Sequence, residues 1–450
     1  MPFPGLPDDF LWGTASAAYQ VEGAVAEGGR APSVWDTFCA RPGRVRDEDT
    51  GAVAADHYHR YREDVALLRD LGVGAYRFSV SWPRVLPGGR VNAEGLGFYD
   101  RLVDELCEAG IAPAATLFHW DTPQELEDAG GWVNRDTAAR FAEYAEVVGA
   151  KLGDRVRMWM TINEPVVVTL FGYALDVHAP GRALGFDALP VAHHLLLGHG
   201  LAARALRAAG CSNIGIASNH GPVWAASESE ADRTAAEAYD TLVNWLFADP
   251  LLRGRYPAPE LAAAMPGPVA EDLKVISEPL DFFGLNYYQP TLIGAAAPDE
   301  ESAVASAPLP PGLPFAPKPL SGYPTTDFGW PVVPDGLRET IALFTARYGD
   351  DLPPIYVTES GCSYHDGDPV AGRVADQARI DYHESHLAAL ARAVSDGADV
   401  RGYFAWSATD NFEWAAGYRE RFGLIHVDYE TQRRTPKDSY FWYRDVIGRG

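Results

Sequence analysis

Cysteine is scarce in this chain of 450 residues, and its few copies stand far apart. The four cysteines, Cys39, Cys107, Cys211 and Cys362, form no CxxC pair and have no cluster of histidines nearby. This spacing argues against a disulfide framework and against a zinc site of the familiar kinds. We therefore expect reduced thiols, no bound metal and a cytoplasmic protein.

Long apolar runs are also missing. The first ten residues, MPFPGLPDDF, lack the basic and apolar stretches of a secretory signal peptide. No run of about eighteen apolar residues occurs, which is the length that a membrane-spanning helix needs. The sequence thus predicts no membrane segment and leaves the cytoplasm as the default location.

Basic residues are outnumbered, because 37 lysines and arginines stand against 62 aspartates and glutamates, a formal net charge of −25 at pH 7. An acidic chain is repelled by the phosphates of nucleic acids and by anionic membranes, so neither is expected as a partner. The hydrophobic content of 47% is ample for a large core and excludes a disordered chain.

Short apolar segments alternate with longer amphipathic ones along the chain. Parallel strands covered on both faces form near-continuous apolar runs, and each return to a parallel neighbour needs a crossover helix. The expected strands are residues 10–14, 75–80, 112–117, 157–162, 214–218, 282–287, 355–358 and 402–406. Helical spacing is found at residues 58–71, which end at a C-capping Gly72, and at 96–109, 136–152 and 375–395. Eight strands alternating with helices predict an α/β fold, the (β/α)8 TIM barrel.

We expect this barrel to be a single domain over residues 1–450. A doubly wound open sheet is the main alternative, but no GxGxxG or GxxxxGK[ST] motif follows any expected strand. Residues 295–328 are rich in proline, alanine and serine. A domain linker has this composition, but a long loop at the active-site face is favoured, because a strand and a helix follow the segment.

Polar and aromatic side chains stand at the carboxyl ends of seven expected strands, which is where TIM barrels carry their catalytic residues. They are Gln20, Arg77, His119, Asn163, Glu164, Asn286, Tyr288, Glu359, Trp406, Glu413 and Trp414. A helix cap or a loop hydrogen bond would explain any one of them alone. Their convergence on one face of the barrel predicts a binding site.

Two carboxylates in this set suit a catalytic pair. Glu164 follows the fourth strand and Glu359 ends the seventh, 359 − 164 = 195 residues later, so only the fold brings them together. In glycoside hydrolysis, one carboxyl protonates the leaving oxygen while the other attacks the anomeric carbon or activates water. No GxSxG nucleophile motif competes with this interpretation.

A metal site formed by His119, Glu164 and Glu359 is the other interpretation. The accompanying indoles and amides favour a sugar instead. An indole packs against the C–H face of a pyranose, and amide, imidazole and carboxyl groups can bind its hydroxyls. We therefore predict a carbohydrate ligand, with no metal and no cofactor.

Longer segments occur in the order typical of one known family. They are FLWGTASAAYQVEG from Phe10, YRFSVSWPRVLP from Tyr76, HWDTPQ from His119, TINEP from Thr161, NYY from Asn286, VTESG from Val357 and WSATDNFEW from Trp406. Through them the chain resembles glycoside hydrolase family 1, the β-glucosidase-like retaining hydrolases, over almost its whole length. The resemblance implies a (β/α)8 barrel and hydrolysis with net retention.

The resemblance also assigns roles. It implies that Glu164 is the acid/base, that Glu359 is the nucleophile, and that Trp406 lies under the sugar. The residues implied to hold the hydroxyls of the nonreducing-end sugar are Gln20, His119, Asn163, Glu413 and Trp414, and those implied to support the nucleophile are Arg77, Asn286 and Tyr288. An adjacent Arg77 would favour an ionised Glu359, whereas burial and a neighbouring carboxylate would raise the pKa of Glu164.

The chain departs from the family pattern at three positions. Ser360 follows the nucleophile where asparagine is usual, Val166 follows the NEP motif where tryptophan is common, and Asp176 replaces a common glycine. Val166 and Trp330 are expected on the aglycone side, where the lost indole reshapes the leaving-group pocket. For Trp330, packing within its loop is an equal alternative. The aglycone preference therefore stays open.

We predict an exo-acting β-glucosidase and leave β-fucosides and β-galactosides open as further substrates. A 6-phospho-β-glycosidase is disfavoured because Glu413 would repel a sugar phosphate. A non-catalytic binding barrel and a myrosinase-like enzyme are disfavoured because Glu164 and Glu359 are both present, while transfer of the sugar to an alcohol stays open. The expected partner is a small-molecule β-glycoside, and association into a homo-oligomer is left open.

Overall fold

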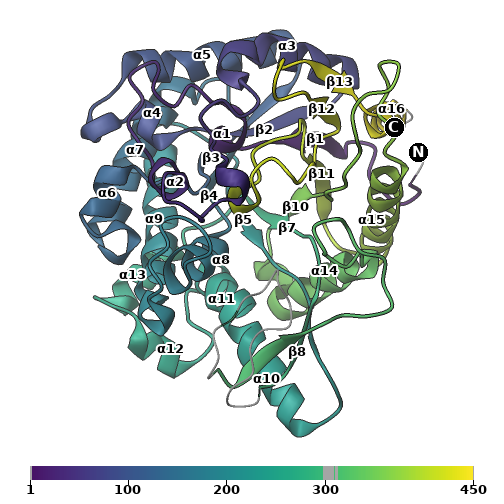
Figure 1. Ribbon diagram of the computed structural model, residues 1–450. Coiled ribbons are helices and arrows are strands. Elements are labelled where there is room, and N and C mark those ends of the chain that lie inside the picture. Colours follow the sequence, from purple (N-terminus) through teal and green to yellow (C-terminus); the bar gives the residue numbers. More distant parts are fainter. Residues whose placement is uncertain (1–2, 297–308, 310–312, 449–450) are drawn as a thin grey trace.

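A closed barrel of eight parallel strands forms the centre of the molecule (Figure 1). The computed structural model describes residues 3–296, 309 and 313–448. Around the barrel the strands follow in the order β1 (Leu11–Ala15), β11 (Val400–Trp406), β10 (Ile355–Ser360), β7 (Phe282–Asn286), β5 (Ile214–Asn219), β4 (Met158–Asn163), β3 (Ala112–Phe118) and β2 (Ala75–Ser79). The predicted (β/α)8 TIM barrel is confirmed, and every predicted strand lies within two residues of an observed one.

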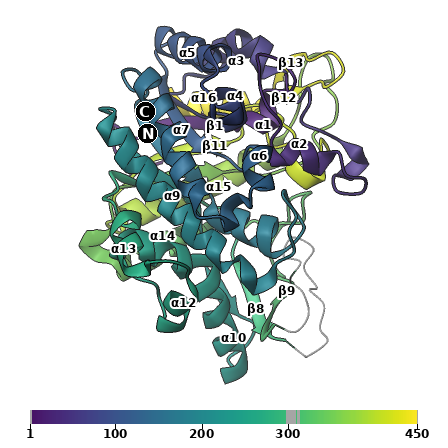
Figure 2. The ribbon, with the colours of Figure 1, turned by 90° about the vertical axis from the view of Figure 1, so that its left-hand side faces the viewer.

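Helices connect the strands and cover the outside of the barrel (Figures 1 and 2). They include α1 (Ala18–Val21), α2 (Val34–Cys39), α3 (His57–Leu71), α4 (Trp82–Val85), α5 (Ala93–Glu108), α6 (Gln124–Asp128), α7 (Asp136–Leu152), α8 (Pro165–Val167), α9 (Leu189–Ala208), α10 (Glu230–Asp240), α11 (Leu246–Arg253), α12 (Pro259–Ala264), α13 (Val269–Ile276), α14 (Pro334–Tyr348), α15 (Gln377–Ser395) and α16 (Asp438–Ile447). None of the helices in the described ranges is both long and apolar enough to cross a membrane.

The strands are buried on both faces, as their apolar sequences require. Every residue of β2 (AYRFS) and of β4 (MWMTIN) is buried. One apolar cluster joins side chains from different strands of the barrel, among them Ala75, Met160 and Phe404. The small alanines leave room inside the closed sheet for the larger methionine and phenylalanine side chains, so the barrel has a packed interior.

Local signals in the sequence set the ends of the helices. Helix α3 ends at Gly72, whose φ of 86° lies in the left-handed region that glycine adopts without strain. The Gly72 amide donates to the carbonyls of Leu68 (3.1 Å) and Arg69 (3.0 Å), which satisfies the end of the helix. The predicted C-cap is confirmed.

A small three-stranded sheet lies outside the barrel, beside α10 (Figures 1 and 2). In it β8 (Thr291–Ala295) pairs in parallel with β6 (Val223–Ala225) and antiparallel with β9 (Phe315–Lys318). Strand β9 falls inside residues 295–328, so this predicted long loop is in part a strand. Its residues 297–308 and 310–312 lie outside the described residues.

Candidate active site

A cavity of about 450 Å³ opens at the carboxyl ends of the barrel strands. Its wall contains predicted site residues from distant parts of the sequence: His119, Glu164, Val166, Tyr288, Trp330, Glu359, Trp406, Glu413 and Trp414. Four further predicted residues, Gln20, Arg77, Asn163 and Asn286, are almost fully buried. Their side chains contact members of the wall, so the structure brings the whole predicted set together.

Glu359 lies near the end of β10 and is held from two sides. Arg77 Nη1 lies 2.5 Å from Glu359 Oε1, and the Tyr288 hydroxyl donates to Oε2 at 2.8 Å. Burial raises the pKa of Glu359, while Arg77 and then the Tyr288 hydrogen bond oppose that rise. On balance the pKa of Glu359 lies above its ordinary value of 4.5, so Arg77 and Tyr288 offset only part of the effect of burial. The ion pair and the hydrogen bond favour the charged form that a nucleophile needs.

Glu164 follows β4 directly, and its backbone adopts the left-handed region with φ of 48°. Its Oε1 accepts hydrogen bonds from Asn286 Nδ2 (2.8 Å) and Asn219 Nδ2 (3.2 Å). Burial, followed by the charge of Glu359, raises the pKa of Glu164 to about 8. A carboxyl group with this pKa carries a proton at neutral pH, as an acid catalyst must.

One side chain, Asn163, connects the surroundings of the two glutamates. Its Oδ1 accepts from Arg77 Nη2 (2.6 Å) and from Asn286 Nδ2 (3.0 Å). Its Nδ2 lies 3.1 Å from His119 Nε2. Asn163 thus joins the arginine beside Glu359 to the amide beside Glu164. It is fully buried behind the wall of the cavity.

Glu413 lines the cavity, and Gln20 lies buried against it. Gln20 Nε2 donates to Glu413 Oε2 at 3.1 Å, and Asn411 Nδ2 donates to the same oxygen at 3.0 Å. Gln20 Oε1 and His119 Nδ1 are buried without a hydrogen-bond partner among the described residues. Unpartnered polar atoms next to a cavity match the hydroxyl-rich rim of a sugar.

Aromatic rings form the other part of this wall. The His119 ring is nearly parallel to those of Trp406 and Trp414, at 17° to each. Trp120 contacts Trp414 with ring centroids 4.6 Å apart, and its Nε1 donates to the Asn163 carbonyl at 3.0 Å. Strand β11 ends at Trp406, and the loop that follows returns Trp414 to the same cavity.

Val166 and Trp330 both line the cavity. Trp330 stacks on Phe328 with ring centroids 4.6 Å apart and contacts Tyr288 edge-on at 5.2 Å. Trp330 therefore both packs in its loop and faces the cavity. Asp176 is exposed and does not line the cavity, and its carboxylate pairs with Arg44 at 2.7 Å.

Ser360, the departure next to Glu359, is fully buried. Its hydroxyl lies 3.3 Å from the Tyr382 hydroxyl, and its carbonyl accepts from the Tyr403 hydroxyl at 3.4 Å. Tyr382 of α15 and Tyr403 of the neighbouring strand β11 therefore contact the end of β10 at Ser360.

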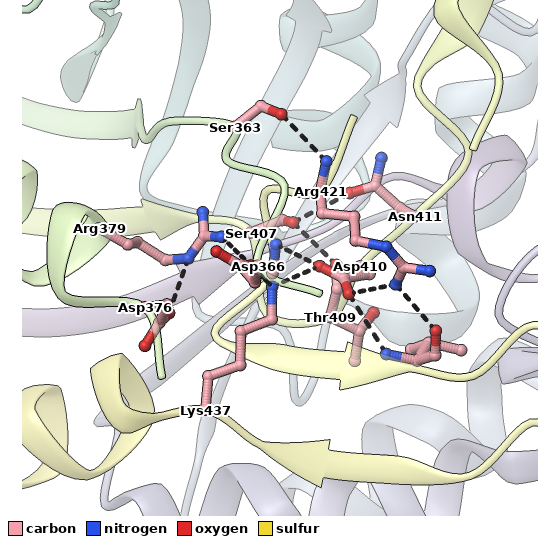
Figure 3. Close-up of polar contacts among 12 residues, drawn as sticks. Ser363, Asp366, Asp376, Arg379, Ser407, Thr409, Asp410, Asn411, Arg421 and Lys437 are labelled. Atoms are coloured by element: carbon pink, nitrogen blue, oxygen red, sulfur yellow. Dashed lines mark hydrogen bonds and ion pairs between the residues drawn. The ribbon is translucent and has the colours of Figure 1, made fainter. Parts of the chain in front are cut away.

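Behind the loop that carries Glu413, a cluster of buried charges joins several segments (Figure 3). Lys437 Nζ lies between Asp410 Oδ1 (2.8 Å) and Asp366 Oδ2 (2.6 Å), and its side chain is fully buried. Arg421 donates to Asp410 Oδ2 at 2.7 Å, and Arg379 donates to Asp366. The paired cations hold the pKa of Asp410 at about 2 against the opposing effect of burial. The cluster fixes the loop after β11 to the loop after β10.

Two contributors to this site did not enter the prediction. Asn219 ends β5 and binds Glu164, while Trp120 lines the cavity beside His119. The sequence SNHG places polar side chains at the end of β5, as at the other strand ends, so Asn219 could have been found. Trp120 lies within the quoted segment HWDTPQ. Among the described residues, no group of three His, Cys, Asp or Glu side chains is arranged to hold a metal ion.

Comparisons with known proteins agree with this geometry. The model of glycosyl hydrolase family 1 matches residues 4–450. The chain is 45% identical to a bifunctional beta-D-glucosidase/beta-D-fucosidase of Bifidobacterium breve, over 98% of each chain. It superposes on a psychrophilic beta-glucosidase of Micrococcus antarcticus with a TM-score of 0.93 and 47% identity, over 99% of this chain and 98% of the other. For a Thermotoga maritima beta-glucosidase in complex with glucoimidazole, the TM-score is 0.91 and the identity 42%, over 99% of each chain.

Proposed function

The chain belongs to glycosyl hydrolase family 1, and on that premise we propose that it is a retaining exo-β-glucosidase that removes terminal β-D-glucosyl residues. The observation that carries the proposal is the different environment of two neighbouring glutamates. Glu359 contacts a buried arginine, whereas Glu164 has amide partners and a pKa of about 8. A carboxyl paired with a cation and a carboxyl that keeps its proton at neutral pH suit the roles of nucleophile and acid.

In the first step, a carboxylate oxygen of Glu359 attacks the anomeric carbon. The bond from that carbon to the leaving oxygen breaks, and the proton of Glu164 moves to this oxygen. Arg77 and Tyr288 lie against Glu359 on both of its oxygens and orient it for the attack. The negative charge of Glu359 is consumed in the covalent bond, so the pKa of Glu164 falls when the glycosyl-enzyme forms.

In the second step, Glu164 is the base. It accepts a proton from water, whose oxygen attacks the anomeric carbon and releases Glu359 as a carboxylate. Two displacements at the same carbon give a product with the configuration of the substrate. The amides of Asn286 and Asn219 remain on Glu164 throughout and hold its position.

We propose that the sugar lies on Trp406 and that its outer hydroxyls meet Gln20, His119 and Glu413. Support comes from the unpartnered Gln20 Oε1 and His119 Nδ1, which are free to bind hydroxyl groups. Because a relative is named for both glucosidase and fucosidase activity, we include β-fucosides as expected substrates. Asn163 acts behind the wall through its contacts with Arg77 and His119.

The test uses p-nitrophenyl β-D-glucoside and the variants Glu359→Ala and Glu164→Ala. Both should lose most of the activity. With azide, Glu359→Ala should form the inverted α-glucosyl azide, because azide replaces the nucleophile directly. With azide, Glu164→Ala should form the retained β-glucosyl azide, because azide attacks the glycosyl-enzyme. Full activity in Glu359→Ala, or the opposite azide products, would overturn these assignments.

The remaining parts of the proposal concern the protein as a whole. We propose a single catalytic domain located in the cytoplasm, in keeping with the dispersed unpaired cysteines and the acidic composition. Transfer of the glucosyl group to alcohols is a second expected activity, because Glu164 can deprotonate an alcohol as it deprotonates water.

A further inference from the structure

A second cavity, of about 190 Å³, lies beside the catalytic cavity. Among the residues that the structure describes, its wall is built almost wholly from aliphatic and aromatic side chains, such as Leu189, Leu242, Leu246 and Phe247. Among the polar side chains that line it, Thr169 already donates its hydroxyl to the Pro165 carbonyl at 2.8 Å. The described part of its wall therefore offers a ligand apolar contacts and few hydrogen bonds.

The two cavities share part of their walls. Val166, Leu170, Tyr239 and Val243 line both of them. Val166 belongs to α8, which follows β4 directly, so the shared wall begins two residues beyond Glu164. The two cavities are therefore neighbours on the two sides of these side chains.

The position of Glu164 tells which part of a substrate meets this wall. An acid catalyst must reach the oxygen between the sugar and the leaving group, so the aglycone lies on its side of the site. Gln20 and Glu413, proposed for the sugar, do not line the second cavity. The second cavity therefore lies on the aglycone side of the catalytic site.

We propose that the second cavity binds the far end of an extended apolar aglycone, such as the alkyl chain of a long-chain β-glucoside. This inference rests on the proposed β-glucosidase function. A sugar aglycone would lose the hydration of its hydroxyls in this cavity without finding partners, which costs free energy. An alkyl chain gains from transfer out of water and needs no partner.

The experiment measures glucose release from methyl, butyl, hexyl and octyl β-D-glucoside, each below its micelle-forming concentration. The value of kcat/KM should rise from butyl to octyl, by at most about fourfold for each methylene that becomes buried. Cellobiose should show no comparable gain over methyl glucoside.

Two variants address the cavity itself. Ala174→Phe fills it, because Ala174 is half-buried in its wall, and Leu242→Asn makes the wall polar. Both should lower the ratio of the octyl to the methyl kcat/KM by about tenfold or more. Leu343→Asn is the matched control, since Leu343 is 41% exposed on α14 and lines neither cavity. Its ratio should equal that of the wild type.

The outcomes separate this inference from the proposed function. If no glucoside releases glucose, the proposed function is wrong. If all glucosides are hydrolysed but kcat/KM does not change with chain length, or if both cavity variants keep the wild-type ratio, the second cavity does not bind the aglycone. Melting temperatures of the variants show whether a changed ratio comes from a folded protein.

Discussion

Arg77 and Glu359 form a buried ion pair, with Nη1 of the arginine 2.5 Å from Oε1 of the glutamate. Both side chains are at most 4% exposed, so water screens their attraction poorly. The same guanidinium donates to Asn163 Oδ1 at 2.6 Å and to Thr116 Oγ1 at 3.0 Å. Arg77 is thereby fixed in position before a substrate arrives.

Replacing Arg77 should change both the rate and the pH dependence. Arg77 lowers the pKa of Glu359, so in Arg77→Met that pKa rises and the acidic limb of kcat/KM moves to higher pH. We expect a loss of at least about a hundredfold in kcat, because one partner of a buried, hydrogen-bonded pair is left without the other. Tyr288→Phe removes only the hydrogen bond from the Tyr288 hydroxyl to Glu359, so it should move the acidic limb of kcat/KM to higher pH by a smaller amount. An unshifted acidic limb in Arg77→Met would contradict this view of the pair.

The basic limb of activity should report Glu164. Its pKa of about 8 means that kcat/KM falls as pH rises through about 8, where the acid loses its proton. In Glu164→Gln this limb should disappear, and a substrate with an activated leaving group such as 2,4-dinitrophenyl β-glucoside should still form the glycosyl-enzyme. Because burial also raises the pKa of Glu413 to about 8, Glu413→Gln is the control. If the basic limb of kcat/KM persists in Glu413→Gln and is absent in Glu164→Gln, it belongs to Glu164.

Removing Glu164 should also alter stability at high pH. The folded-state pKa lies above the ordinary value of 4.5, so the folded protein holds a proton that the unfolded chain has lost. The stability from this group is complete below pH 4.5 and is lost as pH rises through about 8. Glu164→Gln should therefore gain about 1–2 kcal/mol in unfolding free energy at pH 8, relative to the wild type, and much less at pH 4.5. Urea unfolding at the two pH values measures this, and an equal change at both would refute the linkage.

Glu413 should control the response to a phosphate on the sugar. The wild type should hydrolyse p-nitrophenyl β-glucoside far better than its 6-phosphate, and the preference should grow as pH rises through about 8 and Glu413 ionises. Glu413→Ser should lower kcat/KM for the glucoside by about tenfold to a hundredfold, as expected for lost hydrogen bonds to a buried carboxyl. The same substitution should lower kcat/KM for the 6-phosphate by a smaller factor. A wild-type preference for the phosphate would exclude the proposed substrate.

The buried cluster around Lys437 should dominate stability far from the reacting atoms. Lys437→Met leaves Asp410 and Asp366 with one cation fewer and should cost about 3–5 kcal/mol in unfolding free energy. Lys274→Met is the matched control, because Lys274 pairs with Glu271 on the surface with 68% of its side chain exposed. It should cost about 0.5 kcal/mol or less.

Asp410 adds a pH test of the same cluster. Its pKa of about 2 lies below the ordinary value of 3.8, so the unfolded chain takes up a proton before the folded protein does. The stability from this group is present above pH 3.8 and is lost as pH falls through about 2. Asp410→Asn should therefore destabilise the protein at neutral pH but much less near pH 2. Equal destabilisation at both pH values would contradict the role of its charge.

Much of the fold followed from local patterns. The apolar runs predicted each barrel strand to within two residues, because a parallel strand buried on both faces has few other compositions available. Strand β9 was missed because it has only four residues, FAPK, and lies in a segment rich in proline and alanine. So short a segment shows no alternation of apolar and polar residues that would indicate a strand. Asn219 was missed because no carboxylate or indole stands beside it, although the sequence SNHG at the end of β5 is as polar as the other strand ends.

The sequence by itself determined the residue types, their order and the strand to which each belongs, since these depend on neighbours along the chain. It could not place Asn163 between Arg77 and Asn286, nor show that burial holds a proton on Glu164. Those properties arise where strands β2, β4, β7 and β10 meet, across separations of up to 282 residues. Only closure of the barrel excludes water there, and without that exclusion two glutamates would be equal carboxylates in place of an acid and a nucleophile.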